Sequence, residues 1–203
     1  MTSDGFGLAD PLAGFRQLFD AATLRSVAQA MFEGWSEYFF MIGSSAAALI
    51  GLMFVVVTLT AGHQSDQVEQ GKHLYTSPIV WHLAVVLVLS GAAIAPAVTA
   101  RLYGLASGAL ALLGIAIGAR SAVGIVRRPG APDAVGFDMF WYGVAPLIVY
   151  LGLAAAAVGI LEGASWGAAG VAADLMALLL VSIHAEWDLV TYLAPIAGSG
   201  DRS

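Results

Sequence analysis

The chain has 203 residues, of which 59% are hydrophobic and 11% charged, and its mean hydropathy is +0.83. Soluble domains carry about a quarter charged residues, so this composition excludes an ordinary soluble fold. The absence of cysteine excludes disulfides, thiolate metal ligands and a cysteine nucleophile. A net charge of -6, with 8 Lys and Arg residues in total, argues against a nucleic-acid partner. The remaining class is an integral membrane protein in a lipid bilayer.

The first element in chain order is an amphipathic helix within residues 1–37. Between Asp10 and Gly34 the apolar residues fall largely at helical spacing, with charged and amide side chains between them. A helix with this division is expected to lie in the headgroup plane and to lead into the membrane. The alternative is a helix that packs on a partner or on its own bundle.

Five long apolar segments follow. The first, Tyr38 to Ala61, carries no charge and at 1.5 Å per residue is long enough to cross a hydrocarbon layer of about 30 Å. After a polar loop the second segment starts at Pro78, since proline is tolerated in a first helical turn. We therefore predict an all-α integral membrane protein with five transmembrane helices in residues 38–194 and a polar tail at 195–203. The predicted spans are about 38–61, 78–99, 102–126, 139–161 and 168–190.

The Lys and Arg residues near the span ends are distributed unequally between the two sides of the membrane. The side with more of them carries Arg120, Arg127 and Arg128 as a cluster. The positive-inside rule assigns this side to the cytoplasm. The sequence thus predicts a multi-pass inner-membrane protein with its N-terminus outside and its C-terminus in the cytoplasm.

Small residues four apart mark faces on which transmembrane helices approach closely. The first span carries one such stripe and the third carries two. These predicted packing positions are Gly43, Ala47, Gly51, Gly104, Gly108, Gly114 and Gly118. The contacts they favour lie within one chain, in a homo-oligomer, or with another membrane protein.

Asp174 is the one ionisable side chain near the middle of a predicted span. Such a group costs about 2.5 to 3.5 kcal/mol on insertion scales, so it is expected to face the bundle interior or a water-filled path. In the functional interpretation, ions or protons pass this acid. In the structural one, it accepts hydrogen bonds from hydroxyls of neighbouring spans, such as Ser45, Thr58, Ser90 or Tyr150.

Because the spans alternate in direction, several ionisable residues gather on one side of the membrane. This candidate polar-face cluster comprises His63, Asp66, His73, His82, His184 and Asp188. In the segment HAEWD, His184 and Asp188 are four residues apart and adjacent on a helix, whereas Glu186 lies about 160° away. A metal ion or a haem bound by the histidines is conceivable, but no cofactor is predicted.

No motif of a soluble enzyme is present: no P-loop, dinucleotide fingerprint, HExxH or GxSxG. The serines of the predicted helices have no nearby base, so no catalytic residue is predicted. Three interpretations remain, which are ion or proton permeation past Asp174, a non-catalytic accessory or scaffold subunit of a membrane complex, and an intramembrane metal- or haem-binding protein.

Two segments resemble known proteins. EYFFMIGSSAAALIGLMFVVVTLTAG and AEWDLVTYLA are similar to the first and last helices of small uncharacterised bacterial inner-membrane proteins, with a GxxAAALxGLxFV pattern in the first and an AWDLV-like pattern in the last. The resemblance implies the five-span architecture and no particular activity. A local similarity to Orai calcium channels covers residues 32–96, but this first span has no internal acidic residue and the chain has five predicted spans instead of four.

Overall fold

The structure, a computed structural model, describes residue 32 and residues 34–60, 66–96, 98–126 and 140–199. Its regular secondary structure is entirely helical over these residues, which confirms the predicted all-α class. The elements are α3 (Ser36–Thr60), α4 (Asp66–Ile94), α5 (Ala100–Val126), the π-helix η1 (Phe140–Val144), α7 (Ala145–Leu161) and α8 (Trp166–Ser199). The predicted N-terminal amphipathic helix lies, apart from its last residues, outside the described residues.

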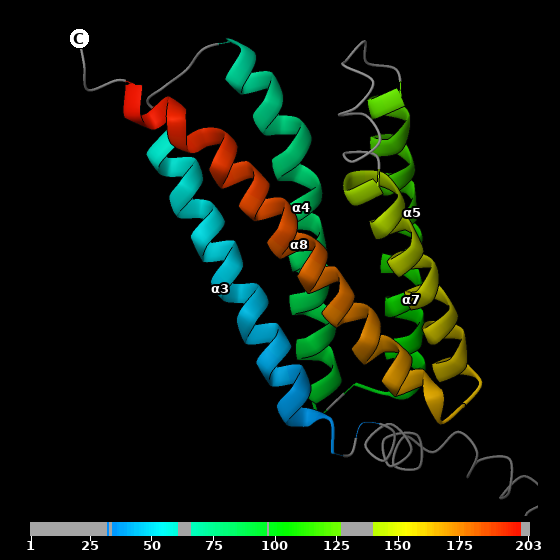
Figure 1. Ribbon diagram of the computed structural model, residues 1–203. Coiled ribbons are helices and arrows are strands. Elements are labelled where there is room, and N and C mark those ends of the chain that lie inside the picture. The colour runs from blue at the N-terminus through cyan, green and yellow to red at the C-terminus, as the bar shows by residue number, and fades with distance from the viewer. Residues whose placement is uncertain (1–31, 33, 61–65, 97, 127–139, 200–203) are drawn as a thin grey trace, which may run out of the picture.

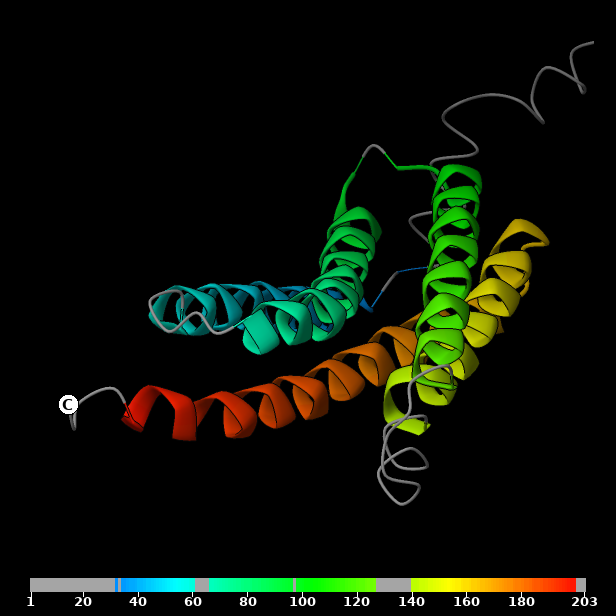
Figure 2. The same cartoon turned by 90° about the horizontal axis from the view of Figure 1, so that it is seen from above.

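Four of the five long helices form two antiparallel pairs, and the fifth, α8, joins the pairs (Figure 1). Helix α3 packs along α4, and α5 packs along α7. Helix α8 starts at the end of α7, contacts α4 and also packs on α3, so it runs obliquely across both pairs, as Figure 2 shows from above. With 34 residues it is about 51 Å long. Side chains from three other helices therefore meet on α8.

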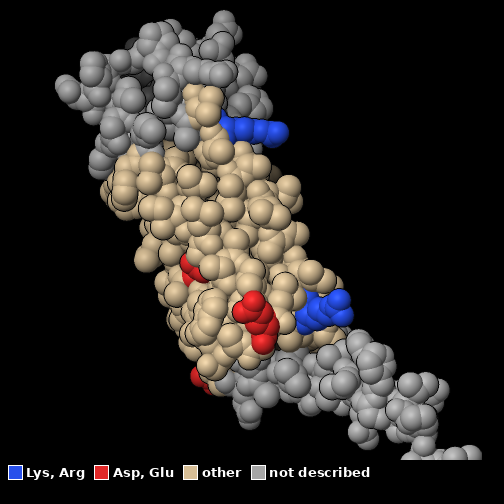
Figure 3. Space-filling model, turned by 90° about the vertical axis from the view of Figure 1, so that its right-hand side faces the viewer, with Lys and Arg blue, Asp and Glu red and all other residues tan. Residues whose placement is uncertain are grey.

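Among the described residues, four helical stretches are long and apolar enough to cross a membrane. These stretches are Ser36–Thr58, Ala100–Arg120, Phe140–Leu161 and Trp166–Thr191, and α4 contributes a shorter apolar stretch, Pro78–Ile94. All five long helices expose large apolar side chains on the outside of the bundle. The face in Figure 3 has an uncharged band between Lys or Arg side chains toward its two ends, with Asp and Glu side chains in its lower half. The protein is therefore a multi-pass α-helical membrane protein whose helices contact lipid.

Helix α4 begins at Asp66 and continues through Pro78, where the sequence had predicted the second span to begin. The apolar part of α4 does start at Pro78, but the helix extends before it. Helix on both sides tolerates the cost of about 3 kcal/mol that an internal proline carries, because it removes one N–H and crowds the preceding turn. The residues before Pro78 include several good helix formers, so the polar stretch extends the helix instead of forming a loop.

Helix α5 begins at Ala100, two residues before the predicted start of the third span, so Arg101 lies in its first turn. The hydroxyl of Thr99 accepts a hydrogen bond from the N–H of Leu102, with an N–O distance of 3.2 Å. A threonine in this position caps a helix by satisfying one of its first free N–H groups. The chain reverses just before it, where the N–H of Val98 donates to the carbonyl of Ala95 at 3.3 Å.

Helix α3 packs on its neighbours through larger residues than the sequence suggested. Of the predicted stripe, Gly43 is buried, and a Cβ there would lie 3.0 Å from the Cβ of Ser90, whereas Ala47 and Gly51 are exposed. Ala47 and Gly51 therefore form no buried contact in the described part of this chain, and their predicted role in packing against another chain stays a prediction. The buried face is instead formed by Phe39, Ile42, Ala46 and Met53, at the 3- and 4-residue spacing of an ordinary helix contact.

The glycines of α5 lie mostly against α7. Added Cβ atoms at Gly104 and Gly108 would lie 2.9 Å from Leu161 and 3.8 Å from the Cβ of Ala157, and one at Gly114 would overlap the ring of Tyr150. Gly118 is also buried, but a Cβ there would have no neighbour within 4 Å among the described residues. Gly104 and Gly114 thus give α5 and α7 their close approach.

Candidate functional site

The contact between α7 and α8 is set by a tight turn and by small residues. Gly163, with φ of +72°, ends α7 in a conformation that glycine adopts without strain, and the N–H of Ala164 donates to the carbonyl of Gly159 at 2.8 Å. Gly170 then lies against Ala156, because a Cβ added at the glycine would be 3.0 Å from the Cβ of Ala156. The two helices continue antiparallel from this point, and we call their contact the α7–α8 seam.

Asp174 lies in this seam. Its carboxyl packs directly on Gly152 of α7, where a Cβ atom would overlap the oxygen Oδ1. The side chain is half-buried and lies eight residues into α8, about 12 Å from Trp166 along the helix. Two residues earlier, the carbonyl of Ala172 accepts a hydrogen bond from the hydroxyl of Tyr38 at 3.0 Å, which ties α3 to α8 beside the acid.

None of the four hydroxyls that the structural interpretation offered to Asp174 bonds to it, and three of them are engaged elsewhere. Ser45 and Thr58 donate to carbonyls of their own helix, and the hydroxyl of Tyr150 lies 2.7 Å from Nδ1 of His82. The hydroxyl of Ser90 is buried without a hydrogen-bond partner in the described structure. Asp174 itself makes no hydrogen bond or ion pair with another described residue. The acid is thus held by packing on Gly152 and not by donors.

The other end of the seam carries a polar group built from α8 and η1. Nε2 of His184 lies 3.4 Å from Oδ2 of Asp188, and the hydroxyl of Tyr142 donates to the same oxygen at 3.2 Å. The ring of Trp141 lies over His184, with 4.0 Å between ring centroids. The sequence placed His184 beside Asp188, but it did not identify Trp141 or Tyr142, whose only signal was an aromatic pair at the start of the fourth span.

His82 lies inside the bundle and not with His184 and Asp188. It is 4% exposed, and its Nδ1 is paired with the hydroxyl of Tyr150 across the contact of α4 with α7. The centroids of the two rings are 5.4 Å apart, and the ring planes are tilted by 47° to one another. Of the six predicted cluster residues, only His184 and Asp188 are brought together in the described structure.

The structure describes little of the other three cluster positions. His63 falls outside the described residues, and the side chains of Asp66 and His73 are not described, although both positions belong to α4. Because α4 is continuous, positions 73 and 82 are about 180° apart around its axis. Within the described ranges, no three His, Asp or Glu residues lie close enough to hold a metal ion.

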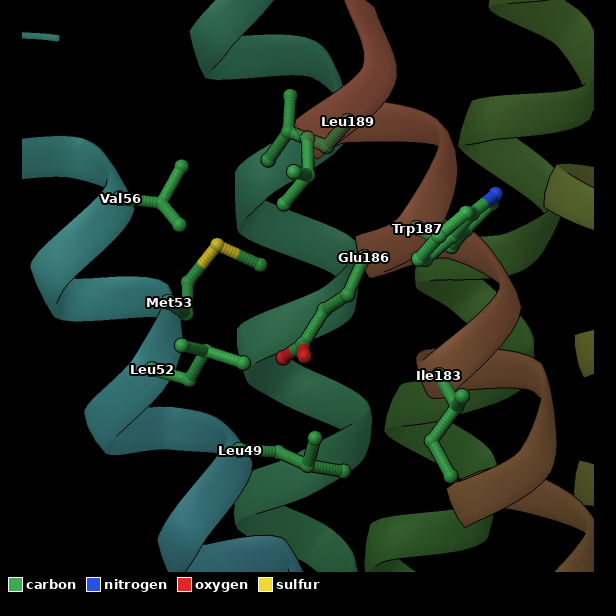
Figure 4. Close-up of a pocket in the computed structure, with 9 residues that line it drawn as sticks. Leu49, Leu52, Met53, Val56, Ile183, Glu186, Trp187 and Leu189 are labelled. Atoms are coloured by element: carbon green, nitrogen blue, oxygen red, sulfur yellow. The ribbon is translucent and has the colours of Figure 1, made fainter. Parts of the chain in front are cut away.

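Glu186 was not among the predicted site residues, yet it is the most deeply buried acid that the structure describes. It is 7% exposed, and its Oε1 has no hydrogen-bond partner in the described part of the chain. The carboxyl points from α8 toward α3 into a pocket of about 300 Å³ (Figure 4). The sequence correctly separated Glu186 from His184 on the helix, but it could not show that α3 covers the opposite face.

Comparisons with protein-family models, with characterised proteins and with solved structures find no match to this chain. The class of the protein, a multi-pass α-helical membrane protein, therefore follows from its helices, and its function has to be inferred from its own side chains.

Proposed function

We propose that the protein conducts protons or small ions across the membrane along the α7–α8 seam, past Asp174. The observation that carries this proposal is an acid within a membrane-crossing helix that lies at a helix contact and has no partner among the described residues. Ionisable groups within a span are costly, and they typically mark ion or proton pathways. Asp174 meets this description better than any other residue of the seam.

The polar end of the seam supplies the outer part of the pathway. Asp188, with its Tyr142 and His184 partners, lies fourteen residues from Asp174, about 21 Å along α8. Groups of this kind exchange protons with water and with one another. The side chains of Val181 and Ala185, on the same face of α8 between the two acids, are buried and apolar. Conduction therefore requires α8 to move relative to α7, and Gly152 and Gly170 are two positions where the helices approach closely.

Proton flux into liposomes tests the proposal. The full chain is reconstituted with an internal pH-sensitive dye, and a potassium gradient with valinomycin sets the membrane potential. We expect flux well above that of empty vesicles, its loss in Asp174→Asn, and its retention in Glu162→Gln, which neutralises an exposed acid at the α7–α8 turn. Flux equal to that of empty vesicles, with protein shown to be inserted and folded, contradicts proton conduction. Repeating the assay with sodium- and potassium-sensitive dyes covers small cations.

An accessory or scaffold subunit is the second candidate. It is favoured by the exposed positions Ala47 and Gly51 on α3, where small residues allow the backbone of another helix to approach. Replacing Gly51 by leucine blocks that approach, and a Cβ at this position has no neighbour within 4 Å among the described residues. Affinity purification from native membranes should then recover a stoichiometric partner protein with the natural chain but not with the Gly51→Leu variant. Equal recovery of the partner from both argues against this face.

We also propose that α4 crosses the membrane, which gives five spans with the N-terminus outside and the C-terminus in the cytoplasm of a bacterial inner membrane. In support, α4 packs antiparallel along α3, and its apolar part, Pro78–Ile94, is about 26 Å long. The resemblance of the first and last helices to inner-membrane proteins supports the location. Because the natural chain has no cysteine, single cysteines at Glu162 and Arg120 report topology without background. An impermeant maleimide applied from outside should label position 162 and not 120, and the reverse pattern inverts the orientation.

A further inference from the structure

The pocket that holds Glu186 lies between α3 and α8, on the side of α8 away from Gly152 and the α7–α8 seam. Its α3 wall is apolar and includes Leu49, Met53 and Val56. Figure 4 shows the carboxyl of Glu186 directed at this wall. On the α8 side, Trp187 continues the lining and is 68% exposed. The pocket is therefore open to the lipid-facing surface, from which a ligand can enter laterally.

Glu186 is the only ionisable residue among the described residues that line the pocket. Its Oε1 is fully enclosed and has no hydrogen-bond donor within the described structure. In proteins, polar atoms buried in this way are almost always paired. Among the described residues, no Lys or Arg lines the pocket to balance a charge on this carboxyl. The site therefore lacks a hydrogen-bond donor for this carboxyl. A cationic donor balances the charge of a carboxylate most strongly in a low-dielectric environment.

We propose that this pocket binds a lipophilic amine, with the protonated amine paired to the carboxylate of Glu186 and the hydrocarbon part against the apolar wall from α3. A volume of about 300 Å³ is at the small end of ligand sites, so a compact ligand fits better than a whole lipid. Such an amine concentrates in the bilayer, which brings it to the exposed side of the pocket. The proposal is independent of conduction past Asp174, because a different acid on a different face of α8 carries it.

The binding test uses the full chain in nanodiscs of phosphatidylcholine and tritiated 4-phenylbutylamine as the probe. Empty nanodiscs correct for partition of the amine into lipid. We expect a saturable component of one amine per chain, which excess unlabelled amine displaces and the neutral 4-phenylbutan-1-ol does not. Equal displacement by the alcohol overturns the proposal, because it means that the carboxylate does not select the ligand.

Variants separate the role of the carboxylate from that of the pocket. Glu186→Gln should weaken binding at least about tenfold, since loss of one partner of a buried charge pair has large effects. Glu186→Asp should restore part of it, and Glu162→Gln, at an exposed site, should leave it unchanged. Unchanged affinity in Glu186→Gln overturns the proposal.

A second variant decides the question if Glu186→Gln does not fold. Leu52 lines the mouth of the pocket from α3 and is 53% exposed, so Leu52→Trp fills the opening without disturbing a buried side chain. This variant keeps the carboxylate and should abolish saturable binding. Full binding by Leu52→Trp contradicts the assignment. A protein partner that cross-links to position 52 in a one-to-one ratio and prevents binding of the amine also contradicts the assignment. In that case the pocket binds a helix of the partner.

Discussion

The carboxyl of Asp174 lies directly on the backbone of Gly152, at a point where any side chain on α7 would displace it. This contact places an acid of the membrane-crossing part of α8 directly against the backbone of α7. It also makes the position of the acid adjustable, because the atom nearest to Gly152 is the end of a side chain and not a rigid ring or backbone.

Gly152→Ala should therefore move the carboxyl of Asp174 while leaving the fold almost intact. Alanine is a better helix former than glycine by roughly 0.5 to 1 kcal/mol, which offsets much of the cost of the shifted side chain. We expect a thermal unfolding midpoint in mild detergent close to that of the natural chain, together with a changed proton flux. An unchanged flux at unchanged stability means that the position of Asp174 against α7 has no functional role.

Gly114→Ala should have the opposite effect on stability. A Cβ at this position overlaps the ring of Tyr150, which is buried and cannot turn aside because it also meets His82. Overpacking of this kind costs typically 1 to 3 kcal/mol. Gly118→Ala is the matched control on the same helix, since its Cβ meets nothing within 4 Å among the described residues. Unfolding midpoints that fall equally in both variants contradict the close α5–α7 approach.

The pair of His82 and Tyr150 should show strong energetic coupling. Tyr150→Phe removes the hydroxyl and leaves Nδ1 of a buried histidine unpaired, at about 1 to 3 kcal/mol. His82→Leu similarly leaves the hydroxyl without its partner, whereas the double variant removes both polar groups. We expect the double variant to be less destabilised than the sum of the two single ones, by about 1 kcal/mol or more in a double-mutant cycle. Additive effects contradict the hydrogen bond.

Glu186→Met should stabilise the protein. It replaces an acid whose Oε1 lacks a donor by an apolar side chain of similar size in an apolar pocket, and an unsatisfied buried polar group costs about 1 to 3 kcal/mol. Glu162→Met, at an exposed turn, is the control and should change the unfolding midpoint little. A lower midpoint for Glu186→Met means that the carboxyl has a stabilising partner.

The class of the fold was predictable from the sequence because it depends on length and hydrophobicity alone. The stretch from Tyr38 to Ala61 has no charge over a membrane-spanning length, and it became α3 with nearly the predicted bounds. Adjacency along one helix was equally accessible, since His184 and Asp188 are separated by about one turn. These properties require no knowledge of what lies opposite a helix.

The residues of the candidate sites could not be predicted in this way, because they depend on which helices face one another. Glu186 became prominent only because α3 covers it, and Asp174 only because α7 has a glycine at the facing position. Similarly, Ala47 and Gly51 share the spacing of Gly43 but turn away from the bundle, because α3 packs through Phe39, Ile42, Ala46 and Met53. Spacing along a helix defines its faces without saying which of them is buried.

The central claim, that Asp174 acts as an acid in conduction, is tested most directly by proton flux through the natural chain, Asp174→Asn and Asp174→Glu in parallel liposome preparations. Asparagine keeps the shape of the side chain without its titratable group, and glutamate keeps that group on a longer arm. The account predicts flux at the level of empty vesicles for Asp174→Asn and a substantial remaining flux for Asp174→Glu. Flux through Asp174→Asn equal to that of the natural chain contradicts it.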